Sequence, residues 1–285
     1  MEQSEQLQIG ALHYNVSNLE RAAYFFEEGL GFKPLQTDAH TVTLGTSENV
    51  PLLVLHKVNH PIPRKKTTGL YHIAIRLPNR EELARLIYHM ANNQIEFDGV
   101  ADHGVSESLY LTGPDDMGIE LTVDRDYDEW PIDDEGQLEM GTEELDIDDL
   151  MLTLQGKPKT WVGMPPGTRI GHIHLRAAEL EKTAEFYTKL GFETTQEYGD
   201  QAIYFASGEY HHHIGANTWQ SAGAAALEKD TAGLRYFEIL FPNQSGIDAI
   251  VEDLSNAGIE VNTVDNQVEL CDPNGIYLRL VPASN

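Results

Sequence analysis

The chain has 285 residues, 41% of them hydrophobic, which is enough to bury a sizeable core and favours two domains. Its formal charge of −27, from 46 acidic and 19 basic residues, argues against binding to nucleic acids or anionic membranes, because no bulk phosphate-neutralising surface is available. No apolar run has the length of a membrane span, and the first residues lack the features of a signal peptide, so we expect a cytoplasmic protein. The single cysteine, Cys271, excludes an internal disulfide framework, and we expect it to be structural.

Residues 8–56 form the first recognisable unit of the sequence. Alternating apolar residues predict a strand over 8–16, and helical spacing predicts a helix over 19–30. Ser17 and Asn18 supply a helix cap, and Gly31 and Phe32 end the helix. Short strands are predicted over 41–44 and 51–56, so the unit reads strand, helix, then strands.

Residues 70–124 repeat this order. The predicted elements are a strand over 70–77, an amphipathic helix over 80–92, and strands over 109–111 and 118–123. Alternation places Ile73 and Ile75 on one face of the first strand and His72 on the other. In the last strand, Glu120 lies on the face opposite its apolar neighbours Ile119 and Leu121. An isolated histidine or carboxylate in a strand is usually an ordinary polar residue. A functional role for His72 or Glu120 therefore depends on comparison with the other repeats of the unit.

An acidic segment over 125–167 interrupts the pattern and is the expected domain boundary. It separates an N-terminal domain over 1–124 from a C-terminal domain over 168–285. Residues 168–219 repeat the first unit, with a helix one residue shorter between its opening leucine and closing glycine, and residues 233–281 repeat the second. The chain therefore contains four copies of one strand-helix-strands unit, which predicts an α+β fold of βαβββ-type repeats.

Placing the copies against each other identifies which of them carry ligand-type residues. The first-strand position is occupied in turn by Ala11, His72, His172 and Tyr236, and the last-strand position of the even copies by Glu120 and Tyr277. The second and third copies alone have histidines at the first position. If these two copies pair across the connector, their strands would bring His72, Glu120 and His172 together.

Two histidines and one carboxylate with open positions form the facial triad suited to Fe(II), while Mn(II) and Zn(II) accept the same ligands. Arg76 and Arg176 lie on the ligand side of their strands, where they would balance nearby anions. If the first and second copies pair instead, Ala11 leaves one ligand missing, and His13 or His56 would be its nearest substitute.

The repeat resembles the vicinal oxygen chelate superfamily, and within it the type I extradiol ring-cleaving dioxygenases of the catechol 2,3-dioxygenase kind. The resemblance covers nearly all of the chain outside 125–167. It is carried by the sequences Gly-Leu-Tyr-His-Ile-Ala-Ile over 69–75, Leu-Tyr-Leu over 109–111, Gly-Ile-Glu-Leu over 118–121, Gly-His-Ile-His-Leu over 171–175 and Tyr-His-His-His-Ile-Gly over 210–215.

The resemblance implies paired repeats whose mixed sheets curl around a metal cavity in each of two domains. It implies Fe(II) held by His72, His172 and Glu120. In the commonest relatives the last two repeats form the active pair, but Tyr236 and Tyr277 hold those places here. The expected site therefore depends on pairing of the second and third repeats.

The resemblance also implies three residues that act on the substrate. Tyr110 matches the tyrosine that binds the substrate hydroxyl, and His103 matches the loop histidine upstream of it. The acid/base histidine falls in the 211–213 run, where we favour His212. A shift of one residue in the alignment would assign the acid/base role to His211 or His213 instead. If this run is a strand, alternation places His212 on one side and the other two on the opposite side.

The activity implied is Fe(II)-dependent insertion of O2 into a catechol-type ring, giving a ring-opened semialdehyde acid. The expected partners are thus a small aromatic diol and O2, and a homo-oligomer is compatible with the sequence. Two alternatives stay open: a glyoxalase-like metal-dependent lyase or isomerase, and a metal-free protein that binds a small aromatic compound. Fold alone does not separate these functions.

Overall fold

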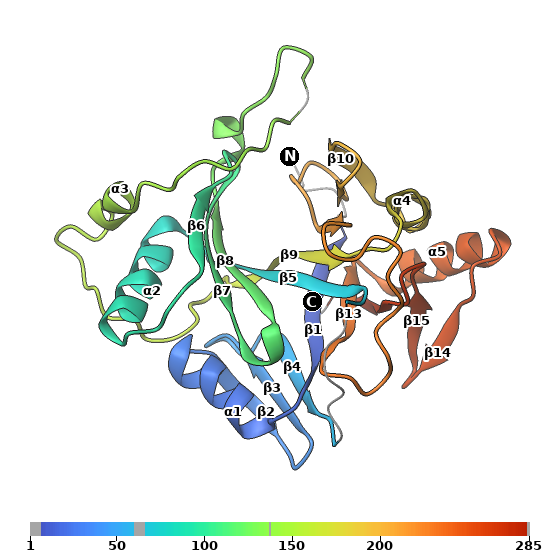
Figure 1. The fold of residues 1–285 in the computed structure, drawn as a ribbon, viewed down its shortest axis with the longest axis horizontal. Helices are drawn as coiled ribbons and strands as arrows, with labels where there is room; N and C mark the ends of the chain where they lie inside the picture. Colours follow the sequence, from blue (N-terminus) through green and yellow to red (C-terminus); the bar gives the residue numbers. More distant parts are fainter. Residues whose placement is uncertain (1–6, 60–65, 137, 284–285) are drawn as a thin grey trace. The chain divides into compact units, whose positions relative to one another are not determined.

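The computed structural model describes residues 7–59, 66–136 and 138–283. The expectation about the start of the chain therefore falls on residues 1–6, outside the described part. Within the described residues, no helix combines the length and the apolar character that crossing a membrane requires. Strands dominate the structure, and helices accompany each repeat, which confirms the predicted α+β fold (Figure 1).

The elements follow one another in four similar groups. The first group is β1 (Gln8–Val16), α1 (Leu19–Tyr24), η1 (Phe25–Gly29), β2 (Lys33–Thr37), β3 (Thr41–Gly45) and β4 (Pro51–Lys57). The second is β5 (Gly69–Arg76), α2 (Arg80–Asn92), β6 (Gly99–Asp102), β7 (Ser106–Thr112), η2 (Pro114–Asp116) and β8 (Gly118–Asp124). The connector contains η3 (Tyr127–Glu129) and α3 (Ile147–Leu152).

The second half of the chain repeats the same order. The third group is β9 (Arg169–Arg176), α4 (Leu180–Lys189), β10 (Glu193–Tyr198), β11 (Ala202–Ala206) and β12 (Ile214–Asn217). The fourth is β13 (Gly233–Phe241), α5 (Gln244–Asn256), β14 (Asn262–Val264), β15 (Gln267–Cys271) and β16 (Tyr277–Pro282). Cys271 is the last residue of β15.

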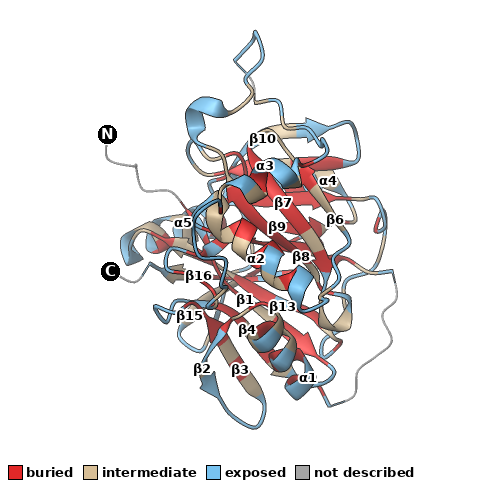
Figure 2. Cartoon of the chain, turned by 90° about the vertical axis from the view of Figure 1, so that its left-hand side faces the viewer, coloured by how far each residue is buried: buried red, intermediate tan, exposed pale blue. Residues whose placement is uncertain are grey.

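Asparagine caps begin three of the main helices. The side chains of Asn18, Asn79 and Asn243 each accept a hydrogen bond from the backbone N–H three residues later, which satisfies one of the unpaired donors of the first turn. The helices then bury one side: α2, for example, buries Leu83, Leu86 and Met90. Figure 2 shows the strands largely buried and the outward sides of the helices exposed.

The first helix differs from the single α-helix expected over 19–30. It changes after Tyr24 into a π-helix over Phe25–Gly29. The equivalent helix of the third repeat, α4, is an ordinary α-helix with one residue fewer between its opening leucine and its closing glycine. A π-turn absorbs one extra residue within the same helical span, so this insertion accounts for the difference.

The strands form two mixed eight-stranded sheets. One has the order β10-β11-β12-β9-β5-β8-β7-β6, and the other β14-β15-β16-β13-β1-β4-β3-β2. The strands of the second and third repeats thus share one sheet, and those of the first and fourth share the other. In the second, third and fourth repeats the first and last strands run parallel, as in β5 beside β8.

By compactness the chain divides into two units. Unit 1 comprises the described parts of Met1–Asn15 and Asn59–Tyr71 together with His172–Asn285, and unit 2 comprises Val16–Val58 and His72–Gly171. These units differ from the expected domains over 1–124 and 168–285, because most of β1 belongs to unit 1, where it pairs with β13. The connector packs within unit 2, where the Arg80 guanidinium binds Asp149 and the Trp161 indole donates to the carbonyl of Leu30.

Equivalent hydrogen bonds tie two repeats together inside each unit. In unit 2, the N–H of Ser17 donates to the Asp115 carboxylate at 2.9 Å. In unit 1, the N–H of Ala178 donates to Oδ1 of Asn274 at 2.8 Å. Each acceptor lies in the turn before the last strand of an even repeat, and each donor follows the first strand of an odd repeat. Asn274 is buried and also contacts Asp272 and Thr183, whereas Asp115 is half-buried.

Candidate metal centre

A histidine and a glutamate meet on the parallel strands β5 and β8. Ala74 is the register partner of Glu120, and His72 lies two residues earlier on the same face of β5. The small Ala74 side chain leaves the Glu120 carboxylate room to reach His72, and the distance from His72 Nε2 to Glu120 Oε2 is 3.0 Å. Glu120 is almost completely buried, at 1% exposure. Burial of a carboxylate is costly unless positive charge or hydrogen bonds compensate it.

Ser108 holds the second oxygen of the glutamate. Its hydroxyl lies 2.6 Å from Glu120 Oε1 and 2.9 Å from the hydroxyl of Thr122. Ser108 is fully buried on β7, the strand antiparallel to β8. With Oε1 held by Ser108, Oε2 is the oxygen that faces His72. Such a hydrogen bond fixes the orientation of a metal-binding carboxylate.

The third candidate ligand lies on β9. His172 is buried, at 4% exposure, and its ring centroid lies 4.1 Å from that of His212. His174 lies two residues later on the same strand face and is also buried. A Cβ atom at Gly215, the β12 partner of His174, would come within 3.0 Å of the His174 ring. Glycine at this position therefore leaves the space that the imidazole occupies.

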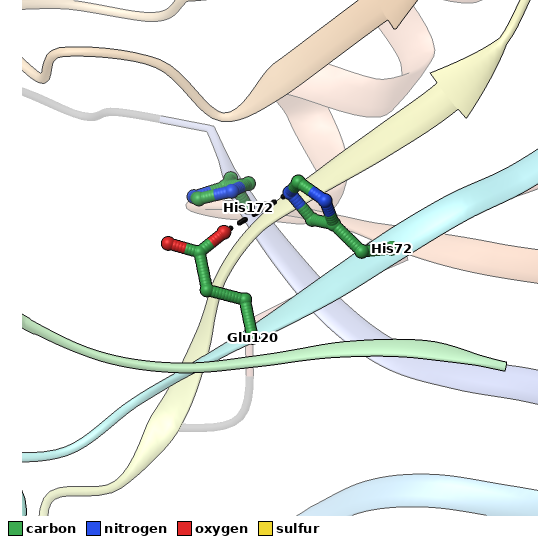
Figure 3. Close-up of side chains that lie close together, drawn as sticks. All are labelled: His72, Glu120 and His172. Carbon is green, nitrogen blue, oxygen red and sulfur yellow. Dashed lines mark ion pairs between the residues drawn. The ribbon is translucent and has the colours of Figure 1, made fainter. Parts of the chain in front are cut away.

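The donor set fits a divalent metal. One ligand atom from each of His72, Glu120 and His172 lies within 4.8 Å of the other two, and Figure 3 shows the three side chains close together. Two ligand atoms that each lie about 2.1 Å from a metal, with an angle of about 90° at the metal, are roughly 3.0 Å apart. His72 Nε2 and Glu120 Oε2 are separated by this distance, 3.0 Å. Two imidazoles and one carboxylate are the donors of a facial triad.

Tyr110 and His103 form a second hydrogen-bonded pair in unit 2. Tyr110 is the register partner of Glu120 on β7, and its ring lies edge-on to His72 with centroids 5.8 Å apart. Its hydroxyl lies 2.6 Å from His103 Nε2. The structure thus brings Tyr110 beside two of the candidate ligands and His103 behind it.

The histidine run over 211–213 does not form the strand that would give the expected alternation, since β12 begins at Ile214. That expectation was wrong. His211 and His212 instead lie side by side, with their Nδ1 atoms 2.8 Å apart, and His212 faces His172. Nδ1 of His213 accepts a hydrogen bond from the N–H of Ser207. Among the three, His212 has the shortest ring distance to His172 that the structure gives, 4.1 Å against 6.3 Å for His211.

Several residues of this region were missed in the sequence. Ser108 shares a strand face with Tyr110, and this alternation was the available signal. His174 repeats the position of His172 two residues later, and its Nε2 lies 3.0 Å from the Asn217 amide. Aromatic rings surround His174, with centroid distances of 5.1 Å to Tyr71 and 5.6 Å to Tyr204. These neighbours come from separate strands, so sequence spacing gave no direct sign of them.

The corresponding positions of the other sheet have a different arrangement. His13 stacks on Tyr236 with ring centroids 3.9 Å apart, and the Arg279 guanidinium lies 4.1 Å from the same ring. Burial raises the pKa of Tyr236 to about 12, so it remains a neutral phenol near pH 7. Tyr236, which holds the position of a candidate metal ligand in the aligned repeats, packs against His13 and Arg279. Arg76, expected to balance an anion, pairs with Asp124 at 2.5 Å.

Curled mixed sheets built from repeated βαβββ units, with a histidine and carboxylate donor set on the central strands, define a class of metal-site proteins. The chain belongs to the Glyoxalase/Bleomycin resistance protein/Dioxygenase superfamily, whose family model matches residues 8–121 and 169–275. This assignment confirms the resemblance to the vicinal oxygen chelate superfamily.

Individual relatives cover nearly the whole chain. The chain is 34% identical over 282 residues to a catechol-2,3-dioxygenase of Bacillus subtilis, covering 97% of this chain and 98% of that protein. Among solved structures, the cppA protein of Streptococcus pneumoniae has a TM-score of 0.62 at 13% identity, with coverage of 98% and 99%. Glyoxalase I of Zea mays has a TM-score of 0.58 at 14% identity, with coverage of 97% and 92%. The two structural likenesses show a shared fold.

Proposed function

We propose that this protein is an Fe(II)-dependent extradiol dioxygenase acting on a catechol-type substrate. The observation that carries the proposal is the donor set of His72, Glu120 and His172, whose ligand atoms lie within 4.8 Å of one another. The identity of 34% with a protein named catechol-2,3-dioxygenase, over nearly the full length of both chains, supports the same activity.

The donor set favours Fe(II) over the other candidate metals. Two histidines and one carboxylate leave coordination positions open for substrate and O2, as in non-haem Fe(II) oxygenases. Mn(II) accepts the same ligands, and Zn(II) accepts them without taking part in redox chemistry. His72, His172 and Glu120 would hold the metal, and Ser108 would orient the carboxylate. Bound Fe(II) would supply the redox chemistry that lets O2 react with a catechol.

The remaining residues would act on the substrate itself. The Tyr110 hydroxyl would bind one ring oxygen, and His103 would hold that hydroxyl in place through the 2.6 Å contact. His212 would accept a proton from the substrate and later return one during ring opening. General acid/base assistance of this kind contributes roughly two to four orders of magnitude in rate. The carbon–carbon bond beside the two hydroxyls breaks, and both atoms of O2 enter the semialdehyde acid product.

Anaerobic loading with Fe(II), followed by addition of catechol and O2, tests the proposal. We expect O2 uptake and formation of the yellow ring-opened product in equal amounts. A matched sample of the His172→Ala variant should bind less iron and lose both signals. Absence of O2 uptake by protein shown to contain iron would contradict the dioxygenase assignment.

The same experiment separates the alternatives. A metal-dependent lyase or isomerase would convert its substrate with no O2 consumption, because its metal stabilises an anionic intermediate without redox change. A metal-free binding protein would bind a small aromatic compound equally well after chelation. Metal analysis distinguishes the metal-free binding protein from both enzymes. Either enzyme should contain metal that the His172→Ala variant lacks, whereas the binding protein should contain none in either form.

A further inference from the structure

The two ring nitrogens of His103 have different kinds of partners. Nδ1 lies 2.8 Å from the backbone carbonyl of Gly141, and Nε2 lies 2.6 Å from the hydroxyl of Tyr110. A carbonyl oxygen can only accept a hydrogen bond, so Nδ1 carries the proton. In the neutral ring, Nε2 is then the acceptor, and the Tyr110 hydroxyl donates to it.

The Gly141 carbonyl belongs to a part of the acidic connector that is fastened to the His103 loop. The Gly141 N–H donates to the His103 carbonyl, and residues 102 and 143 form an antiparallel bridge with reciprocal bonds of 2.9 and 2.8 Å. Arg125 adds an ion pair to Asp102. These bonds hold the connector against the loop at Asp102 and His103.

Close packing supports the same attachment. Gly104 has a left-handed backbone, with φ of +76°, and a Cβ atom there would lie 2.8 Å from Pro131 Cγ of the connector. Glycine therefore permits both the turn and the approach of the connector. The first part of the connector also contacts the loop, because the Arg125 N–H donates to the Val105 carbonyl at 2.8 Å.

We propose that the acidic connector is a positioning element of the active site, whose Gly141 carbonyl fixes the Nδ1–H tautomer of His103 and thereby makes Tyr110 a hydrogen-bond acceptor toward the substrate. The proposal rests on the dioxygenase function proposed above and deepens it. Because the Tyr110 hydroxyl donates its proton to His103, its oxygen is left to accept a hydrogen bond from the substrate. The substrate oxygen that Tyr110 binds must therefore still carry its proton. The substrate class selected is a diol that presents a protonated hydroxyl to Tyr110.

The tautomer is tested directly by ¹⁵N NMR of the protein loaded with diamagnetic Zn(II), at about pH 8, above the ordinary pKa of histidine. The His103 signals are assigned by their absence from the spectrum of His103→Gln. We expect a protonated Nδ1 and an unprotonated Nε2. Protonation of Nε2, alone or together with Nδ1, would overturn the proposal without bearing on whether the protein is a dioxygenase.

The contribution of the connector is tested with a pair of variants at Glu143. Glu143→Pro removes the N–H that completes the bridge to Asp102, whereas Glu143→Ala keeps it. We expect the proline variant alone to lose the single His103 tautomer in the NMR spectrum. Thermal unfolding of both variants shows whether the proline variant is folded. A folded Glu143→Pro protein with an unchanged His103 spectrum would contradict the role of the connector.

The path through Tyr110 is tested by a double-mutant cycle on the Fe(II)-loaded enzyme. His103→Asn retains an N–H near Gly141 but is too short to reach Tyr110, so we expect kcat/KM to fall roughly tenfold, the effect of one lost hydrogen bond. In the Tyr110→Phe variant, His103→Asn should not lower kcat/KM further, because the hydroxyl that His103 binds is already absent. Additive losses would show that His103 acts by another route. If the unaltered, Fe(II)-loaded protein takes up no O2, the proposed function is rejected. The NMR result on the His103 tautomer does not depend on that outcome.

Discussion

Individual side chains around Glu120 show how a buried carboxylate is held in one orientation. Its two oxygens have separate partners, His72 on one side and Ser108 on the other. The hydrogen bond from Ser108 leaves one oxygen aimed at the proposed metal. Removing such a bond weakens metal binding because the carboxylate gains rotational freedom.

Ser108→Ala should therefore weaken Fe(II) binding by about tenfold or more. The measurement is a competition titration against a chelator of known affinity under anaerobic conditions. Ser106→Ala is the matched control, since Ser106 is a buried serine two residues away on the same strand face and makes no contact with Glu120 that the structure shows. Equal affinities for the two variants would contradict the role of Ser108.

His13 gives a prediction about pH because its surroundings favour the neutral ring. Burial lowers the pKa of His13 below its ordinary value of 6.5, against the raising effect of the hydrogen bond and the charge of Glu238. As pH falls below 6.5, the unfolded chain takes up this proton before the folded one does. The free energy of unfolding therefore decreases through the interval from 6.5 down to the lowered pKa.

His13→Gln should remove this part of the pH dependence. Urea unfolding at about pH 7.5 and about pH 5.5 measures the change in stability for each protein. We expect a larger loss in the unaltered protein than in the variant. A loss of equal size in both would show that His13 titrates alike in the folded and unfolded states.

At the scale of elements, the turn before the last strand of each even repeat ties that repeat to its predecessor. Asn274 and Asp115 occupy equivalent positions, but Asn274 is buried and makes several hydrogen bonds. Removing a buried polar group leaves its partners unsatisfied and costs about 1–3 kcal/mol. Asp115 is only half-buried, so water can replace more of the hydrogen bonding that is lost with its side chain.

Asn274→Ala should therefore lower the free energy of unfolding by about 1–3 kcal/mol, and Asp115→Ala by a smaller amount. Chemical denaturation of the two variants side by side measures the difference. Because the two residues perform the same task in related repeats, each is the control for the other. A larger effect for Asp115→Ala would contradict the argument from burial.

At the scale of the whole molecule, the candidate ligands come from the second and third repeats, whose strands share one sheet. Binding of a metal to the folded state alone stabilises it by about 2.7 kcal/mol when the free metal is at a hundred times its Kd. Fe(II) should raise the Tm of the unaltered protein under anaerobic conditions, and a chelator should reverse the increase.

His172→Ala should abolish this metal-dependent increase. His211→Ala is the matched control, since His211 is also a buried histidine of the same region but lies outside the proposed ligand set. Differential scanning calorimetry with and without Fe(II) measures both. An unchanged metal response in His172→Ala would place the metal elsewhere.

Much of this organisation could be predicted from the sequence because it depends on local patterns. Alternation identified the strands of His72 and Glu120, a cap at Ser17 and Asn18 marked the start of the first helix, and the repeats aligned the candidate ligands. The π-helix was missed because an α-helical pattern does not show one inserted residue. The resemblance predicts a strand over the 211–213 run, but the strand starts only at Ile214, a boundary that no residue pattern marks. Contacts such as Gly141 with His103 depend on tertiary packing and have no local signal.

The pairing of β1 with β13 has a consequence for synthesis of the chain. Gln8 lies opposite Leu240, so one edge of β1 has no partner from β13 until nearly the whole chain has left the ribosome. At about 5–20 residues per second, this interval is on the order of tens of seconds. An unpaired strand edge is a template for aggregation, so the nascent chain should need chaperone protection for most of its translation.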